Sequence, residues 1–172
     1  LGVNVGGSIP NYDPLEVGFT KKESRRFAPF VQYAILASDE AMAQAGIDME
    51  AEDADRFACV FGSGIGGLNM FEHESVVLHE KGAKRVSPLF IPTMISNMAA
   101  GNVSIQLGLK GKCTNVVTAC ATGTNCIGDA LRAIQYGDAD VMFAGGTESC
   151  ICPTGIAGFT ALTALTTRED PL

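Results

Sequence analysis

The spacing of apolar positions predicts a long helix in the first third of the chain. Between Phe30 and Ala45, apolar residues recur at intervals typical of one face of a helix. Pro29 suits the first turn of this helix, and Gly46 suits the position that ends it. The residues expected on the buried face are Phe30, Val31, Ala34, Ile35, Ala41, Met42 and Ala45.

Short apolar runs that alternate with helical patterns indicate an α/β fold. Strands are expected over residues 56–61, 114–118 and 140–144, with a possible edge strand over 1–5. Helices are expected over residues 68–80, 95–107, 120–136 and 154–165, the first three closed by Gly82, Gly108 and Gly137. Because the inner strands are continuous apolar runs, we predict a parallel or mixed sheet covered by helices on both faces.

Two long segments carry no charge at all, residues 86–109 and 149–167. The first is long enough to cross a bilayer. It contains Pro88, Pro92 and several Ser, Asn and Gln residues, so we reject a membrane span. We expect these segments to be deeply buried, in part against another domain or subunit.

Composition and charge exclude several classes of protein. A chain of 172 residues with 47% hydrophobic and 18% charged residues fits one packed domain and excludes disorder as the main state. Twelve Lys and Arg against 19 Asp and Glu give a net charge of −7, which argues against a nucleic-acid-binding protein. The sequence has no basic segment followed by an apolar run, so no signal peptide is visible. We expect a cytoplasmic protein.

The six cysteines and two histidines do not form a metal-binding pattern. There is no Cys-x-x-Cys, and Cys150 and Cys152 are too close in sequence for usual zinc ligation. His73 and His79 would lie about 120° apart around a helix, so they make a poor metal pair. We expect reduced thiols and no metal or cofactor.

The glycine-rich segment at 62–67 has two interpretations. Gly62, Gly64 and Gly67 fit the dinucleotide fingerprint between a strand and a helix, where backbone approaches a pyrophosphate. That fingerprint requires a second strand ending in Asp or Glu, and residues 81–88 provide neither. The sequence therefore favours a tight turn that allows close backbone packing.

Cys120 is the strongest candidate for chemistry. It lies where the apolar segment ending at Thr118 breaks into small residues and a helix begins. Unpaired N–H groups and the positive end of the helix dipole favour a thiolate there, and a thiolate is the better nucleophile. Ala119, Ala121 and Gly123 leave space for a substrate.

The remaining cysteines are expected to be inert small side chains. We place none of them at the start of a helix. They are Cys59, Cys113, Cys126, Cys150 and Cys152.

Several ordered motifs closely resemble the β-ketoacyl-acyl-carrier-protein synthases, in particular the synthase II subtype. The similarity runs over nearly the whole chain. The motifs lie at residues 62–67, 117–123, 127–130, 137–148, 158–159 and 165–168. Large polyketide synthase domains usually carry a Ser-rich run after the cysteine, and residues 121–123 here are Ala, Thr and Gly.

The resemblance implies the N-terminal half of a thiolase-like α/β fold, incomplete at both ends. In that fold each half has a mixed five-stranded sheet flanked by helices, and the enzyme is a homodimer. We expect residues 1–172 to form a partial N-terminal β-ketoacyl synthase domain. The implied partners are acyl- and malonyl-carrier protein, with no nucleic acid and no membrane.

The resemblance also assigns roles to individual residues. Cys120 corresponds to the nucleophile, and its backbone N–H to one half of the oxyanion hole. Ile65 and Phe159 correspond to walls of the acyl pocket, although they could equally be core residues. A docking patch for acidic carrier protein, or else an ordinary solvated face, is formed by Lys22, Arg25, Arg26, Lys84 and Arg85. Thr163 stands where the family often has an arginine.

The resemblance implies that the catalytic histidine pair, the active-site lysine and the second oxyanion N–H belong to the family's C-terminal half, and we expect none of them within residues 1–172. His73 and His79 match none of these and are expected on a helix surface. We therefore expect this chain to be part of a 3-oxoacyl synthase and inactive in condensation alone. The alternatives are a polyketide ketosynthase, a non-catalytic structural or interaction unit, and a nucleotide-binding module.

Overall fold

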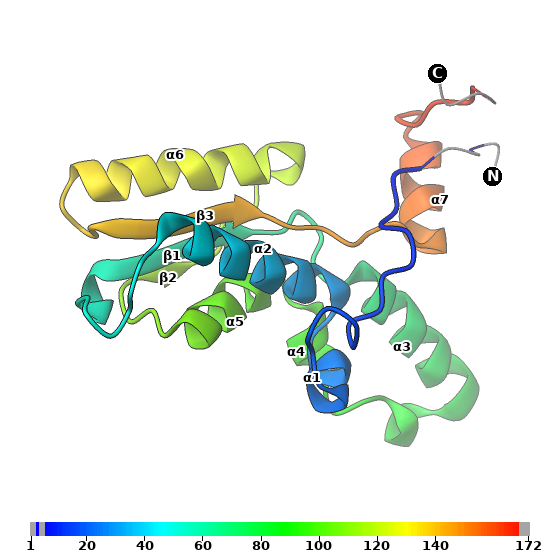
Figure 1. Ribbon diagram of the computed structural model, residues 1–172. Helices are drawn as coiled ribbons and strands as arrows, with labels where there is room; N and C mark the ends of the chain where they lie inside the picture. The colour runs from blue at the N-terminus through cyan, green and yellow to red at the C-terminus, as the bar shows by residue number, and fades with distance from the viewer. Residues whose placement is uncertain (1–2, 4–5, 169–172) are drawn as a thin grey trace.

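A parallel sheet of three strands forms the centre of the computed structural model, which describes residues 3 and 6–168. The strands are β1 (Phe57–Gly62), β2 (Cys113–Thr114) and β3 (Val141–Gly146), in the order β2-β1-β3. Helices α2 (Pro29–Ala45) and α5 (Met98–Leu107) cover one face, and α6 (Thr122–Gln135) covers the other (Figure 1). This arrangement confirms the predicted α/β class with helices on both faces.

The pairing of β1 with β3 positions the site. Phe57 pairs with Val141 at one end of the ladder and Gly62 pairs with Gly146 at the other. Because β1 and β3 are parallel, the segments that follow them leave the sheet at the same edge. Loops at the carboxyl ends of parallel strands are the usual place for ligand sites in α/β folds.

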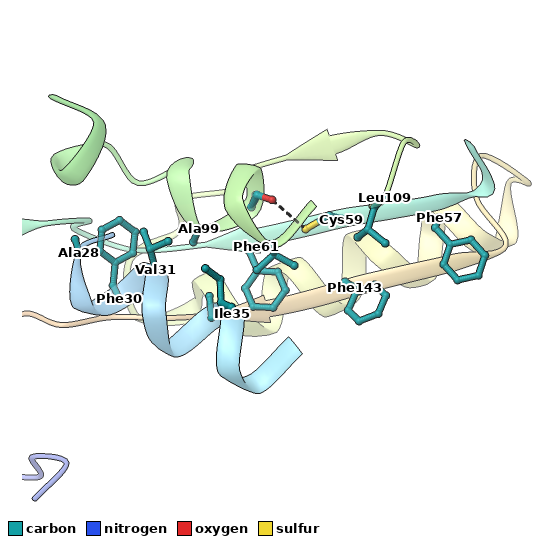
Figure 2. Close-up of a cluster of buried hydrophobic side chains, with 13 residues drawn as sticks. Ala28, Phe30, Val31, Ile35, Phe57, Cys59, Phe61, Ala99, Leu109 and Phe143 are labelled. Carbon is teal, nitrogen blue, oxygen red and sulfur yellow. Dashed lines mark hydrogen bonds between the residues drawn. The ribbon is translucent and has the colours of Figure 1, made fainter. Parts of the chain in front are cut away.

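The larger part of the core fills the space between the sheet and helices α2 and α5 (Figure 2). Phe30, Val31 and Ile35 of α2 are at most 2% exposed. Burial of each such side chain contributes about 1.5–3 kcal/mol. The buried residues of this cluster are Ala28, Phe30, Val31, Ala34, Ile35, Phe57, Cys59, Phe61, Ala99, Ala100, Val103, Leu109 and Phe143.

The predicted face of α2 is buried only in its first half. Ala41 and Ala45 are exposed, whereas Met42 between them is half-buried and packs against the core. On the opposite face of the sheet, a smaller cluster joins Val60 of β1 to Cys126 and Ala130 of α6.

The other elements lie mostly beyond the end of the sheet where β1 and β3 finish (Figure 1). The helices are α1 (Lys21–Arg26), α3 (Leu68–Lys81), α4 (Phe90–Met94) and α7 (Pro153–Ala161). Three short 3-10 turns are η1 (Ala54–Arg56), η2 (Ala83–Arg85) and η3 (Ala119–Ala121).

Helix ends agree with the glycine signals, and some helices differ from expectation. Gly46 and Gly108 end α2 and α5 in the left-handed region, with φ of 64° and 70°. The helix expected over 95–107 is preceded by the separate turn α4, and α7 ends earlier than residue 165. Helix α1 was not predicted, although the spacing of Thr20 and Glu23 is that of the capping box that begins it.

The strand expected over 114–118 is wrong beyond its first residue. After β2 ends at Thr114, the Asn115 side chain donates hydrogen bonds to the carbonyl oxygens of Phe61 (2.9 Å) and Ser96 (3.3 Å). A side-chain amide thus satisfies a β1 carbonyl that a further strand residue could have satisfied. The edge strand expected over 1–5 falls mainly on residues 1–2 and 4–5, which lie outside the described part.

The mixed five-stranded sheet implied by the family resemblance is not confirmed. The described residues form three strands, and all pairings between them are parallel. Within the same residues, no helix has the length and apolar character needed to traverse a bilayer.

Candidate active site

A cavity of about 480 Å³ opens at the edge of the sheet where β1 and β3 end. It is lined by residues that follow β1, by the start of α6, by residues that follow β3, and by α7. These residues are Gly62, Gly64, Ile65, Ala119, Cys120, Thr122, Gly123, Gly146, Thr147, Glu148, Cys150 and Phe159. The cavity therefore collects segments that are far apart in the sequence.

Cys120 lies in this cavity at the start of a helix, as predicted. It belongs to η3, its side chain is exposed, and α6 begins two residues later at Thr122. No side chain caps the N-terminus of α6, because its N-cap residue is Ala121, and the Thr122 hydroxyl accepts a hydrogen bond from the Thr118 N–H (2.8 Å). The N–H groups of Ala121 and Thr122 donate to the oxygens of Thr118 and Ala119, and Cys120 lies at the positive end of the α6 dipole.

The residue before Cys120 has an unusual backbone. Ala119 has φ of 52°, in the left-handed region that non-glycine residues rarely adopt. Such strain is held in place by its surroundings and concentrates at functional sites. Here it turns the chain sharply between Thr118 and α6, which leaves Cys120 at the cavity.

Close backbone packing explains several glycines around the cavity. A Cβ on Gly62 would lie 2.1 Å from Thr122 Cγ2 and 2.3 Å from the Val116 oxygen. A Cβ on Gly146 would lie 2.8 Å from the Cα of Gly123. The missing side chains allow the start of α6 to sit directly against the ends of β1 and β3.

The glycine-rich segment is a packing turn, which confirms the favoured interpretation. A Cβ on Gly67 would lie 2.2 Å from the Thr93 oxygen. Three N–H groups of the segment already bind within the protein: Ile65 to Glu148 Oε2, Gly66 to Ser63 Oγ, and Gly67 to the Met94 oxygen. These groups are not free to bind a pyrophosphate.

Burial distinguishes Cys120 from the buried cysteines. Burial raises the pKa of the Cys59 thiol to about 12, and it also raises the pKa of Cys126. Cys150 lines the same cavity as Cys120, but burial and then the charge of Glu148 raise its pKa. Cys113 is exposed at the start of β2, outside the cavity.

One prediction about the cysteines is wrong. Cys152 is the N-cap residue of α7, so Cys120 is not alone at a helix start. The prediction placed that helix one residue too late. Cys152 is only 8% exposed and does not line the cavity, so burial rather than helix position separates it from Cys120.

Ile65 and Phe159 are brought together with Cys120 on the same cavity. Ile65 is 41% exposed and Phe159 is half-buried, so neither belongs to the closed core. They come from the loop after β1 and from α7, which are far apart in the sequence. Both side chains present apolar surface beside the thiol.

The five predicted docking cations are only partly brought together. Lys22, Arg25 and Arg26 of α1 line a second hollow of about 820 Å³. Lys84 and Arg85 lie in η2, outside that hollow. The other residues lining it are Lys21, Phe27, Leu89, Pro92, Met98 and Asn102.

Neither histidine contributes to the cavity. His73 and His79 are exposed on α3, as predicted. Among the described residues, no three His, Cys, Asp or Glu side chains are grouped closely enough to hold a metal ion.

The sequence analysis missed Glu148. It lies two residues after the end of β3, and its carboxylate accepts hydrogen bonds from the Ser63 hydroxyl (2.9 Å) and the Ile65 N–H (3.1 Å). A carboxylate just after a parallel strand was the available signal, because such residues gather at the ligand-binding edge.

The family model described as "Beta-ketoacyl synthase, N-terminal domain" matches residues 2–172. The chain belongs to the β-ketoacyl synthase family. It is 49% identical, over 168 residues, to 3-oxoacyl-[acyl-carrier-protein] synthase 2 of Staphylococcus aureus, covering 98% of this chain and 41% of the relative. The chain thus spans about two-fifths of the length of this curated synthase.

The chain also matches about two-fifths of the length of solved ketosynthase structures. A β-ketoacyl synthase from Burkholderia phymatum STM815 matches with a TM-score of 0.75 and 29% identity, over 96% of this chain and 39% of that one. The ketosynthase of a type II polyketide synthase, solved with its acyl-carrier protein, shares the fold with a TM-score of 0.83 and 24% identity. That match covers 90% of this chain and 44% of the ketosynthase chain.

Proposed function

We propose that this chain is the nucleophile-bearing N-terminal portion of a 3-oxoacyl-[acyl-carrier-protein] synthase of fatty acid elongation. The position of Cys120 carries the proposal: an exposed thiol beside the start of a helix, in a mainly apolar cavity with Ile65 and Phe159 on its walls. The curated relative of that name supports it. Because the chain spans 41% of that relative, the activity is proposed for the complete protein.

In the first half-reaction, the Cys120 thiolate attacks the carbonyl carbon of an acyl thioester, and the thiolate of the carrier protein leaves. The backbone N–H of Cys120 supplies one half of the oxyanion hole that stabilises the intermediate, and the other half is proposed to come from the remainder of the complete protein. Malonyl-carrier protein then loses CO₂, and the resulting carbanion attacks the acyl-Cys120 thioester. The products are a 3-oxoacyl-carrier protein two carbons longer and the free Cys120 thiolate.

Acylation of Cys120 is the direct test. The full-length protein incubated with acyl-carrier protein should gain the mass of one acyl group, located on the peptide that contains Cys120. The Cys120→Ala variant should gain none, whereas Cys113→Ala, which removes an exposed thiol outside the cavity, should behave as the wild type. Acylation that survives in Cys120→Ala contradicts the proposal and favours the non-catalytic alternative.

The chain by itself is proposed to lack the second half-reaction. The family resemblance implies that a histidine pair stabilises the charge formed during decarboxylation, and the described residues place no histidine on the cavity. Purified residues 1–172 should therefore release no CO₂ from malonyl-carrier protein. Release of radiolabelled CO₂ from malonyl-carrier protein by this chain would contradict the proposal that it lacks the second half-reaction.

The cations of α1 are proposed to dock the acidic carrier protein. Lys22, Arg25 and Arg26 line one hollow. None of the three forms an ion pair with a described residue; the ion pair found in this part of the chain joins Arg56 to Asp140. Local positive charge can steer an acidic partner even when the net charge is −7. A solved ketosynthase of this fold in complex with an acyl-carrier protein supports the idea.

Charge reversal tests the docking surface. In the full-length protein, Arg25→Glu with Arg26→Glu should raise the KM for acyl-carrier protein about tenfold at low salt. Reaction with a small acyl thioester that lacks the carrier should be unchanged. Lys110→Glu, at an exposed position outside the hollow, serves as the matched control. Equal loss with both substrates would contradict a docking role.

A homodimeric assembly and a cytoplasmic location complete the proposal. Exposed apolar side chains on several helices, including Phe71, Ile91 and Ile127, support burial against further protein. All six cysteines are free thiols, which suits a reducing compartment.

A further inference from the structure

The carboxylate of Glu148 joins two segments that leave the sheet beside Cys120. Its Oε1 accepts a hydrogen bond from the Ser63 hydroxyl (2.9 Å), and its Oε2 accepts one from the Ile65 N–H (3.1 Å). The Ser63 oxygen in turn accepts a hydrogen bond from the Gly66 N–H (2.8 Å). Ser63 is 1% exposed, so this short network ties the loop after β1 to a buried hydroxyl.

The backbone that carries Glu148 is itself held in place. The neighbouring Thr147 donates its N–H to the Gly62 oxygen (3.0 Å) and its hydroxyl to the Phe30 oxygen (2.6 Å). These bonds connect the residue to β1 and to α2. The Glu148 carboxylate therefore projects from a fixed point next to the core.

The loop held by Glu148 is in contact with the nucleophile segment. A Cβ on Gly64 would lie 3.1 Å from Glu148 Oε2 and 3.4 Å from the Ala119 oxygen, so Gly64 fits between the carboxylate and the residue before Cys120. Ile65 borders both the Cys120 cavity and a neighbouring hollow of about 410 Å³. A shift of the loop would change the wall between the two spaces.

We propose that Glu148 is a positioning residue that fixes Ile65 and thereby sets which acyl chain lengths Cys120 accepts. This inference rests on the proposed acyl transfer to Cys120. Glu148 is not proposed as a proton carrier, because both of its oxygens are engaged by loop donors. Its effect reaches the substrate through the backbone of Ile65.

The experiment measures selectivity in the full-length protein. Rate constants for Cys120 acylation are measured with N-acetylcysteamine thioesters of increasing chain length, which avoids carrier docking. Glu148→Gln replaces one acceptor oxygen by an NH2 group, which cannot accept the hydrogen bond that this oxygen received from Ser63 or Ile65, and Ser63→Ala removes the hydroxyl that joins Glu148 to the Gly66 N–H. For the two chain lengths that the wild type distinguishes most, each variant should reduce the ratio of rate constants about threefold or more.

The double variant gives a sharper criterion. If Ser63 and Glu148 act as one network, the double variant should lose little more selectivity than either single variant. Glu74→Gln is the matched control, since Glu74 is a buried carboxylate that accepts the Ser87 N–H (2.9 Å) away from the cavity. This control should keep the wild-type ratio.

The outcomes separate this inference from the proposed function. Equal slowing of all chain lengths, or an unchanged ratio, overturns the positioning role while Cys120 remains the nucleophile. Absence of acylation at Cys120 in the wild type overturns both. If Glu148→Gln does not fold, the ratio measured for Ser63→Ala decides by the same criterion.

Discussion

Two thiols of this chain share the cavity, and their surroundings differ. Cys120 is exposed beside the uncapped start of α6, whereas burial and the nearby Glu148 raise the pKa of Cys150. Cys59 lies in β1 with no exposed surface. At the scale of single residues, reactivity is therefore set by access and by the environment of the sulfur rather than by residue type.

Alkylation should reveal this difference. A raised pKa keeps a thiol protonated over a wider pH range, so Cys59, with a pKa of about 12, stays a thiol at mildly alkaline pH. Brief treatment of folded protein with iodoacetamide at about pH 8 should label Cys120 and Cys113 and leave Cys59 unmodified. Peptide mass spectrometry measures the labelled fractions, and labelling of Cys59 as fast as Cys113 would contradict the burial argument.

A pair of glycine variants tests the close packing around the cavity. Gly62→Ala should destabilise the fold by about 1–3 kcal/mol or more, because its Cβ would overlap Thr122 Cγ2 and the Val116 oxygen. Gly101→Ala, inside α5 with nothing within 4 Å of the new Cβ, should instead stabilise by about 0.5–1 kcal/mol. Urea denaturation of both variants measures the opposite signs.

At the scale of elements, the start of the β1–β3 pair is fastened by one ion pair. Arg56 donates to both oxygens of Asp140, at 2.7 and 3.1 Å, and to the Gly137 oxygen at 3.0 Å. The hydrogen bonds from Arg56 lower the pKa of Asp140 below its usual 3.8. Both side chains are solvent-exposed, so the effect on stability should be small.

The lowered pKa of Asp140 determines how the contribution of this ion pair to stability changes with pH. A pKa that is lower in the folded state means that the carboxylate stabilises folding above pH 3.8, and that this contribution is lost as the pH falls through the lowered value. Asp140→Asn should therefore lower the urea midpoint at neutral pH and converge with the wild type in strong acid. Asp138→Asn, a neighbour without a side-chain hydrogen bond to Arg56, should show less difference at either pH.

At the scale of the whole molecule, α6 has apolar residues on two sides. Cys126 and Ala130 pack against the sheet, while Ile127, Leu131 and Ile134 are between 43% and 61% exposed. The exposed three repeat at helical spacing and form one outward stripe. Such a stripe is typical of a helix that is covered by further protein.

The isolated 172-residue chain should therefore associate or bind an apolar dye. Replacing Ile127 and Leu131 by Asp should reduce both properties, because the stripe loses its apolar centre. Ile105→Asp, at a position on α5 that is 77% exposed and outside the stripe, is the control. Analytical ultracentrifugation measures association, and a monodisperse monomer without dye binding would contradict the expectation.

Local signals predicted most elements because their causes are local. Apolar periodicity located α2, α3 and α6, and glycine located the ends of α2 and α5. The same signals were misread where a side chain replaced backbone pairing, as Asn115 does beyond β2. Helix α1 was missed because its capping box was overlooked, although the sequence contained it.

By itself the sequence determined the α/β class, the strand–turn–helix setting of Cys120 and the family, because these follow from patterns between near neighbours. The tertiary structure decided that Ile65 and Phe159 share the cavity of Cys120, and that Lys84 and Arg85 lie outside the hollow of α1. It also brought the Glu148 carboxylate to the Ser63 hydroxyl, a hydrogen bond that spans 85 positions. Contacts over such separations depend on strand pairing and packing, which no local pattern specifies.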